Sequence, residues 1–401
     1  MDKNFIKKIK DFKIFLMDNF NIIDNNIIKR NRKIDFKHII YTCFNKFINH
    51  TSYDIEVGEL NKHILDISNH ITKQGFNQKK NKINNDLFLQ LNNNILNHIY
   101  KDLDKKNRHI LVDGSHLHAN KSLHKFGFKH GSKRESYTKC IIGGIKDHDN
   151  NIPLNYKLNK DMDERKSFID QLEYIECTDI LIFDRGYPSI KLLKVLNNNN
   201  FNYIMRYKKD NLYIKTLIKN NLNEYYFDSN GKKNKVIKYI INEKPYYLLT
   251  NLIDMSIDEL KENYRKRWDI ESHFRDLKHK TSIGNITSKT ENSLLQELYI
   301  NNLIYILTSY FKKLFINEIL LKNNNNNKYK INNSFMINTF FKDILKILLF
   351  KDLDKDKNEL NNIFKYIYVA LNIKYYFKDE ERHYERSLKG PVNKWKASIV
   401  E

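Results

Sequence analysis

The spacing of hydrophobic residues divides the chain into three parts. Residues 1–103 carry apolar positions three and four apart, as in 64–71 (ILDISNHI) and 86–100 (DLFLQLNNNILNHIY), which predicts amphipathic helices. Residues 104–317 alternate short β-branched runs with helical stretches, and residues 318–401 return to helical spacing with a basic composition. This order predicts an α/β fold, in which a sheet flanked by helices lies between helical N- and C-terminal regions.

The predicted strands of the central part are short apolar runs that end in turn-forming residues. The first is 108–115 (RHILVDGS), and 137–145 with 151–158 predict a hairpin. Further strands are predicted within 178–189 (TDILIFDRGYPS) and at 201–208 (FNYIMRYK). From about 209 to 252, a helical piece and three β-like runs predict a β-rich insertion. One long helix should then begin near Ser256, which has Glu259 at capping-box spacing.

Composition narrows the class of partner. The 401 residues include 70 Lys and Arg against 48 Asp and Glu, a formal net charge of +22, which favours a polyanionic partner. The 25 Tyr and 24 Phe offer rings on which bases can stack, so nucleic acid fits better than a membrane. No apolar run is long enough to span a bilayer, and an intracellular protein is expected. Three widely spaced cysteines argue against a zinc site or a disulfide framework.

Two carboxylates follow predicted strands directly. Asp113 ends the run ILVD and Asp184 ends ILIFD. Residues just past the carboxyl ends of strands project into the crevice where α/β proteins bind ligands, although a single aspartate there is often only a turn former. A third acid is Glu271. If the three converge, a divalent cation would relieve their repulsion, and oxygen ligands suit Mg²⁺ or Mn²⁺.

Glu271 lies in a helical segment, 264–278 (YRKRWDIESHFRDLK), with an unusual charge pattern. At 100° per residue, Tyr264, Arg267, Glu271 and Lys278 fall at roughly 0°, −60°, −20° and −40°, so they share one narrow stripe. Such a stripe is commonly a solvated face with ion pairs four residues apart. The alternative is an acid held among phosphate-binding cations, which the spacing alone leaves open but does not favour.

These motifs together resemble those of a known family. Asp113 in VDGSHL, Asp184 in FDRGY and the pattern Y-x₂-R-x₃-E-x₆-K across 264–278 resemble DDE transposases of bacterial-type insertion sequences, within the RNase H-like superfamily. The matching subgroup has this Y-R-E-K signature and a β-rich insertion before its catalytic glutamate. The resemblance covers about 104–317, and 382–395 is similar to the family's basic tail. It implies an RNase H-like mixed sheet in which Asp113, Asp184 and Glu271 hold two Mg²⁺ ions, for which Mn²⁺ can substitute.

The resemblance also implies a reaction and partners. Such enzymes cleave DNA at transposon ends and transfer the 3′-OH into target DNA, acting as homodimers on double-stranded DNA, with the N-terminal region expected to bind the ends. Tyr264, Arg267, Lys278 and Arg185 would then contact phosphates. Tyr246 stands where members that cut through a DNA hairpin carry a base-stacking tryptophan. It is either a smaller stacking face or a strand tyrosine packed on its neighbours.

Two other functions remain open. A catalytically inactive or domesticated transposase could act as a DNA-binding protein, although it would have no reason to retain all three acids together with the tyrosine, arginine and lysine. A nuclease with an RNase H-like fold would explain the acids but not the Y-R-E-K stripe.

Overall fold

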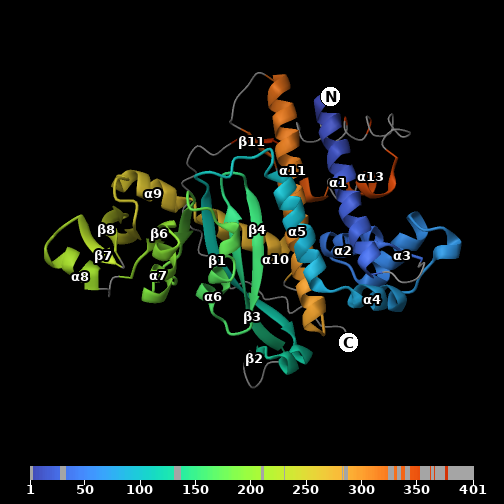
Figure 1. Ribbon diagram of the computed structural model, residues 1–401, viewed down its shortest axis with the longest axis horizontal. Coiled ribbons are helices and arrows are strands. Elements are labelled where there is room, and N and C mark those ends of the chain that lie inside the picture. Colours follow the sequence, from blue (N-terminus) through green and yellow to red (C-terminus); the bar gives the residue numbers. More distant parts are fainter. Residues whose placement is uncertain are drawn as a thin grey trace.

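A single mixed sheet forms the centre of the molecule in the computed structural model (Figure 1). The structure describes residues 3–27, 33–130, 137–208, 212–229, 231–281, 283, 288–323, 329–331, 336–338, 344–352, 362, 365 and 375–377. Within these residues the sheet has nine strands, in the order β2-β3-β1-β5-β6-β9-β8-β7, with β4 paired to β3.

The strand order of the central sheet is that of an RNase H-like fold. Three antiparallel strands are followed by two parallel ones, in the spatial order β4-β3-β1-β5-β6. Their bounds are β1 (His109–Asn120), β3 (Tyr137–Asp147), β4 (Ile152–Asn159), β5 (Ile180–Phe183) and β6 (Asn202–Arg206). Each lies where the apolar runs predicted a strand, so the predicted fold class is confirmed.

The predicted β-rich insertion extends this same sheet. Its strand β9 pairs antiparallel with β6, and β8 and β7 follow outward. The bounds are α8 (Leu212–Lys219), β7 (Glu224–Ser229), β8 (Lys232–Ile241) and β9 (Lys244–Thr250). At the opposite edge a 3₁₀ turn, η2 (Lys121–Phe126), leads into the short strand β2 (Lys129–His130), which pairs with β3.

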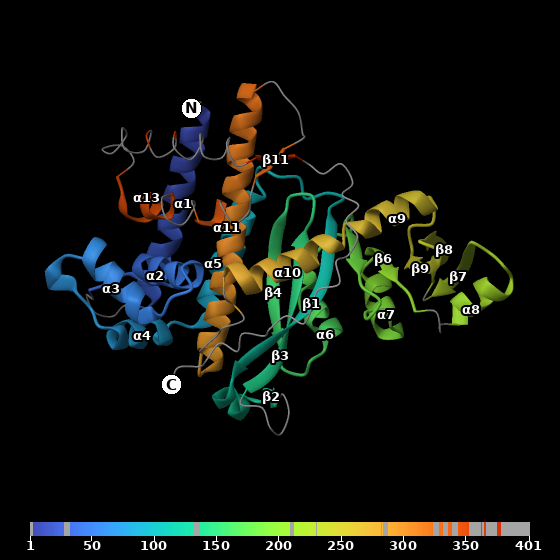
Figure 2. The same ribbon diagram turned by 180° about the vertical axis from the view of Figure 1, so that it is seen from behind.

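Helices cover both faces of the sheet. Helix α6 packs on one face against β3 and β4, while α10 crosses the other face (Figures 1 and 2). The bounds are α6 (Glu164–Ile169), η3 (Leu172–Tyr174), α7 (Ile190–Asn198), α9 (Ile257–Arg265), α10 (Trp268–Lys280) and α11 (Glu291–Asn323). The capping box of Ser256 and Glu259 is present at the start of α9, as predicted.

The expectation of one long helix after Ser256 is wrong. The chain forms two helices, because the backbone N–H groups of Lys266 and Arg267 donate to carbonyls only three residues back, at Asn263 and Tyr264. This 3₁₀-type tightening ends α9 and starts α10, so Tyr264 and Glu271 belong to different helices.

The N-terminal region is helical and shares a core with the rest of the protein. Helices α2 and α5 pack against α11. Buried polar contacts cross this boundary, with Lys46 Nζ 3.5 Å from Glu297 Oε1 and Lys80 Nζ 3.0 Å from Ser293 Oγ. The bounds are α1 (Lys3–Ile27), α2 (Phe36–Ile48), α3 (Tyr53–His63), η1 (Ile67–Asn69), α4 (Lys73–Lys82) and α5 (Asn85–Ile99).

Only parts of the C-terminal region are described. Helix α13 (Leu345–Phe350) packs near α2, and the short strand β10 (Tyr329–Ile331) pairs antiparallel with β11 (Tyr375–Phe377). The basic segment 382–395 lies outside the described residues. None of the helices among the described residues is both long and apolar enough to cross a membrane.

Candidate active site

The two predicted aspartates lie side by side at one edge of the parallel strands. Strands β1 and β5 pair in parallel as far as Val112 and Phe183, so Asp113 and Asp184 are the next residues along the chain. Asp184 directly follows β5, as predicted, but the prediction that Asp113 ends its strand is wrong, because β1 continues to Asn120 by pairing with β3. The strand residues before them are fully buried, whereas both aspartates are half-buried. The sheet register therefore brings the two carboxylates together where β5 ends.

Glycines opposite Asp113 allow helices to approach both faces of the sheet. Across the antiparallel pair, Asp113 faces Gly144 and Gly114 faces Gly143. A Cβ on Gly144 would lie 2.8 Å from Phe274 Cζ of α10, and one on Gly143 would lie 2.4 Å from Ser167 Cβ of α6. Directly opposed residues share a face, so Asp113 projects on the side of α10.

The Asp113 carboxyl is in an environment that disfavours its charge. Burial raises its pKa to about 7, the charges of Glu164 and Asp184 add to this, and the Gly114 N–H and Arg267 oppose it. The Gly114 nitrogen is 2.9 Å from Asp113 Oδ1. Three acids thus act on one another here, which is the electrostatic situation that a bound cation stabilises.

Arg267 links the aspartates to the predicted glutamate. It is 4% exposed, and its charge acts on both Asp113 and Asp184. Its Nη1 is 2.6 Å from Glu271 Oε1, and the Glu271 side chain is 40% exposed. Within the described part of the chain, neither Arg267 Nε nor the buried Tyr264 hydroxyl has a hydrogen-bond partner. Glu271 is therefore paired with the arginine of its own stripe.

The other predicted DNA-binding residues have different surroundings. Arg185 is exposed and Lys278 is half-buried, with burial lowering the pKa of Lys278. Neither forms an ion pair with a described residue. Tyr246 stacks on Tyr239, with ring centres 5.7 Å apart, and the Arg206 guanidinium lies 4.7 Å from the centre of the Tyr246 ring. Tyr246 is thus packed on its neighbours, which is the second of the two roles expected from the sequence.

Two residues near the aspartates were missed from the sequence. Glu164, in the first turn of α6, acts on Asp113, and its own pKa is raised by burial and by Asp184. Nothing in its local sequence distinguishes it from other helix-start acids. Arg206 ends β6 and interacts electrostatically with Tyr264. The search for residues at the ends of strands, which selected Asp184, would also have selected Arg206.

The donor set fits hard divalent cations in chemistry but is not assembled around a common point. Carboxylate oxygens suit Mg²⁺ and Mn²⁺, and the absence of a side chain at Gly114 leaves room for the Glu164 carboxyl group on the α6 side of β1. In the described parts of the chain, no three His, Cys, Asp or Glu side chains are already grouped as metal ligands. Glu271 is paired with Arg267, so its side chain would have to rotate before it could join the aspartates around an ion.

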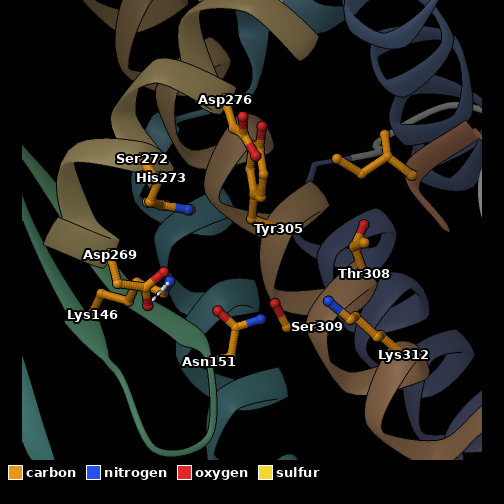
Figure 3. A pocket seen from close by; sticks show the side chains of 11 residues that line it. Lys146, Asn151, Asp269, Ser272, His273, Asp276, Tyr305, Thr308, Ser309 and Lys312 are labelled. Carbon is orange, nitrogen blue, oxygen red and sulfur yellow. Dashed lines mark hydrogen bonds and ion pairs between the residues drawn. The ribbon is translucent and has the colours of Figure 1, made fainter. Parts of the chain in front are cut away.

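A small cavity of about 60 Å³ lies between α10, α11 and the end of β3 (Figure 3). None of its lining residues is a predicted site residue. Asp269 of α10 lies 2.6 Å from Lys146 Nζ and 3.2 Å from His148 Nδ1. Although burial raises the pKa of Asp269, the bond from His148 and the charge of Lys146 hold it well below its usual range. These contacts attach α10 to the sheet at Asp269, two residues before Glu271 in the same helix.

Parts of this chain are similar to known proteins. Residues 104–307 match the family described as Transposase DDE domain. The chain is 25% identical over 138 residues to a Synechocystis sp. (strain ATCC 27184 / PCC 6803 / Kazusa) protein described as "Putative transposase for insertion sequence element IS4SA". That match covers 32% of the chain and 40% of the relative, so less than half of the relative's length is spanned. The solved piggyBac transposase synaptic complex with hairpin DNA is similar with a TM-score of 0.49 and 12% identity, over 87% of this chain and 82% of that one.

Proposed function

Because the chain belongs to the Transposase DDE domain family, we propose that it cleaves phosphodiester bonds at transposon ends and transfers the 3′-OH into target DNA. The observation that carries this proposal is the position of Asp113 and Asp184 on neighbouring parallel strands, within the matched region. Together with Glu271 they would hold two Mg²⁺ ions, with Mn²⁺ as a substitute. When bound, such ions activate water and stabilise the departing 3′ oxygen in an in-line displacement.

The protein's own residues would bind and orient the DNA. Arg267 would offer its guanidinium to a phosphate beside the scissile bond once its ion pair with Glu271 opens, because its Nε is buried in the present arrangement. The Tyr264 hydroxyl is also buried, and it would donate to a phosphate oxygen after the same side chains move apart. Lys278 and exposed Arg185 would add point charges along the strand. Tyr246 would offer a stacking face if cleavage passes through a hairpin.

The partner would be double-stranded DNA, bound by a homodimer that holds two ends together. The net charge of +22 supports this because many phosphates must be neutralised along each end. The helical N-terminal region would recognise the ends, and the protein would act inside the cell, where its DNA lies. Its Y-R-E-K stripe would place it in the subgroup with a β-rich insertion.

A nicking assay tests the proposal directly. The full-length protein is mixed with duplexes that carry terminal inverted repeats found beside its gene, in the presence of Mg²⁺. The parent protein should nick at the repeat boundary, and Asp184→Asn should abolish nicking. Asp170→Asn is the matched control, because Asp170 is an exposed aspartate at the end of α6. Undiminished nicking by Asp184→Asn would remove the catalytic proposal.

Two alternative functions give different results in the same assay. A domesticated DNA-binding protein would bind the repeats but would nick them with neither Mg²⁺ nor Mn²⁺. A nuclease with the same fold would nick unrelated duplexes equally well and would never join a 3′-OH to a second DNA.

A further inference from the structure

The Glu164 side chain lies against the backbone that carries both aspartates. A Cβ on Gly114 would be only 2.6 Å from Glu164 Cγ and 2.9 Å from Glu164 Oε1, and a Cβ on Gly186 would be 3.9 Å from Glu164 Oε2. Gly114 follows Asp113 directly, and Gly186 lies two residues after Asp184. The Glu164 carboxyl therefore occupies the space that a side chain at position 114 would fill, between the two aspartate-bearing segments.

Neighbouring residues of α6 fix this position. Arg165 Nε donates to the Tyr187 carbonyl at 2.9 Å and Arg165 Nη2 donates to the Gly186 carbonyl at 2.5 Å. These bonds tie the start of α6 to the loop that follows Asp184. Asp163 caps the helix by accepting from the backbone N–H of Arg165 and of Lys166. Glu164 thus projects from a helix start that is bonded to the loop carrying Asp184.

The Glu164 carboxylate has no hydrogen-bond donor in the part of the chain that the structure describes, although His116 and Arg165 lie near enough to act on its charge. A half-buried carboxylate without a donor, which acts electrostatically on Asp113 and is acted on by Asp184, is unfavourable unless a cation balances these charges. A neutral side chain of similar size would fill the same space without this repulsion. The close approach of Glu164 to Gly114, the bonds that hold the start of α6, and the missing donor are therefore explained together if Glu164 faces a cation.

We infer that Glu164 is a fourth acidic residue of the cation site, supplying a carboxylate oxygen on the side of the sheet opposite α10. This inference rests on the proposed function, because it assigns a further residue to the same site. Asp113 and Asp184 come from the sheet, Glu271 from α10 and Glu164 from α6, so the two helices would contribute acids from the two faces. Arg165 is a positioning residue, since it holds α6 to the loop after Asp184.

Binding of Mn²⁺ alone to the full-length protein provides the first test. Free Mn²⁺ is followed by electron paramagnetic resonance during titration, without DNA. Glu164→Gln should weaken the affinity about tenfold or more, the range seen when residues that support a metal site are removed. Asp113→Asn should weaken it further. Glu173→Gln, which changes an exposed glutamate in the nearby turn η3, should bind as the parent does.

The outcomes separate this inference from the proposed function. Parent-like Mn²⁺ binding by Glu164→Gln, together with loss of binding by Asp113→Asn, would overturn the role of Glu164 and leave the proposed site intact. Parent-like binding by Asp113→Asn as well would remove the proposed site itself.

A second readout distinguishes ion binding from a purely structural role. If Glu164 helps to hold an ion, Glu164→Gln should need about tenfold more Mg²⁺ for half-maximal nicking and should recover much of its rate at high Mg²⁺. A residue needed only for folding would lower the rate equally at every Mg²⁺ concentration, and this result would contradict the inference. Without metal, Glu164→Gln should be at least as stable as the parent, because the repulsion with Asp113 and Asp184 is removed.

Discussion

Substitution of Gly143 tests how closely α6 must approach the sheet. An added Cβ would lie 2.4 Å from Ser167 Cβ, whereas ordinary contacts begin near 3.4 Å, and Ser167 Cα would be 3.6 Å away. The clash is with the base of a side chain and its helix backbone, so it cannot be relieved by a flexible end. Overpacking of this kind costs about 1–3 kcal/mol, and Gly143→Ala should lie near the upper end of that range.

A double-mutant cycle identifies the cause of this loss. Ser167→Gly alone should cost about 0.5 kcal/mol through helix propensity, with a further loss from the 3.1 Å bond of Ser167 Oγ to the Asp163 carbonyl. In the double variant the clash is gone. Its loss of unfolding free energy should therefore be about 1–2 kcal/mol smaller than the sum of the two single-variant losses. Gly58→Ala is the control, because its Cβ would meet open space within α3 and should stabilise by about 0.5–1 kcal/mol.

Urea denaturation followed by far-ultraviolet circular dichroism measures these free energies of unfolding. The reasoning would be refuted if Gly143→Ala unfolded like the parent, or if the Gly143 and Ser167 effects added to within about 0.5 kcal/mol. Since α6 carries Glu164, the rescued double variant should also recover DNA nicking that Gly143→Ala loses.

Three further predictions concern other parts of the molecule. Burial lowers the pKa of His38 to about 4. As the pH falls from about 6.5 to 4, His38 therefore becomes protonated in the unfolded chain but stays neutral in the folded chain. Up to about 3 kcal/mol of stability should be lost in that window, and His38→Gln should lose less by urea denaturation. Arg267→Gln should weaken binding to end DNA and should reduce the slope of log affinity against log salt concentration by about one unit. The control Arg265→Gln, which changes an exposed arginine, should do neither. Equal effects of the two substitutions in binding titrations would argue against a phosphate contact by Arg267. Asp269→Ala should cost about 1–3 kcal/mol, because buried Lys146 loses its ion pair, and an unchanged urea midpoint would contradict this.

The sequence predicted those parts of the site that depend on local pattern. Asp113 and Asp184 could be located because each follows a continuous apolar run, and parallel neighbours then bring such residues to one edge. Glu164 could not be predicted, because its importance depends on contact with Gly114, fifty residues earlier in the chain. Helical spacing correctly placed Arg267 and Glu271 within reach of each other, but it did not show the tightened turn at Lys266.

The structure differs in how firmly it holds the three predicted acids. Asp113 is held by its pairing with Gly144 of β3, and Asp184 directly follows Phe183, the last paired residue of β5. Glu271 is on a helix attached to β3 by the Asp269–Lys146 ion pair and by the contact of Phe274 with Gly144. Moving that helix as a body would break both of these contacts, whereas rotating the Glu271 side chain away from Arg267 breaks one half-exposed ion pair of modest strength. Assembly of the proposed cation site would therefore turn the Glu271 side chain away from Arg267 while α10 stays attached to the sheet.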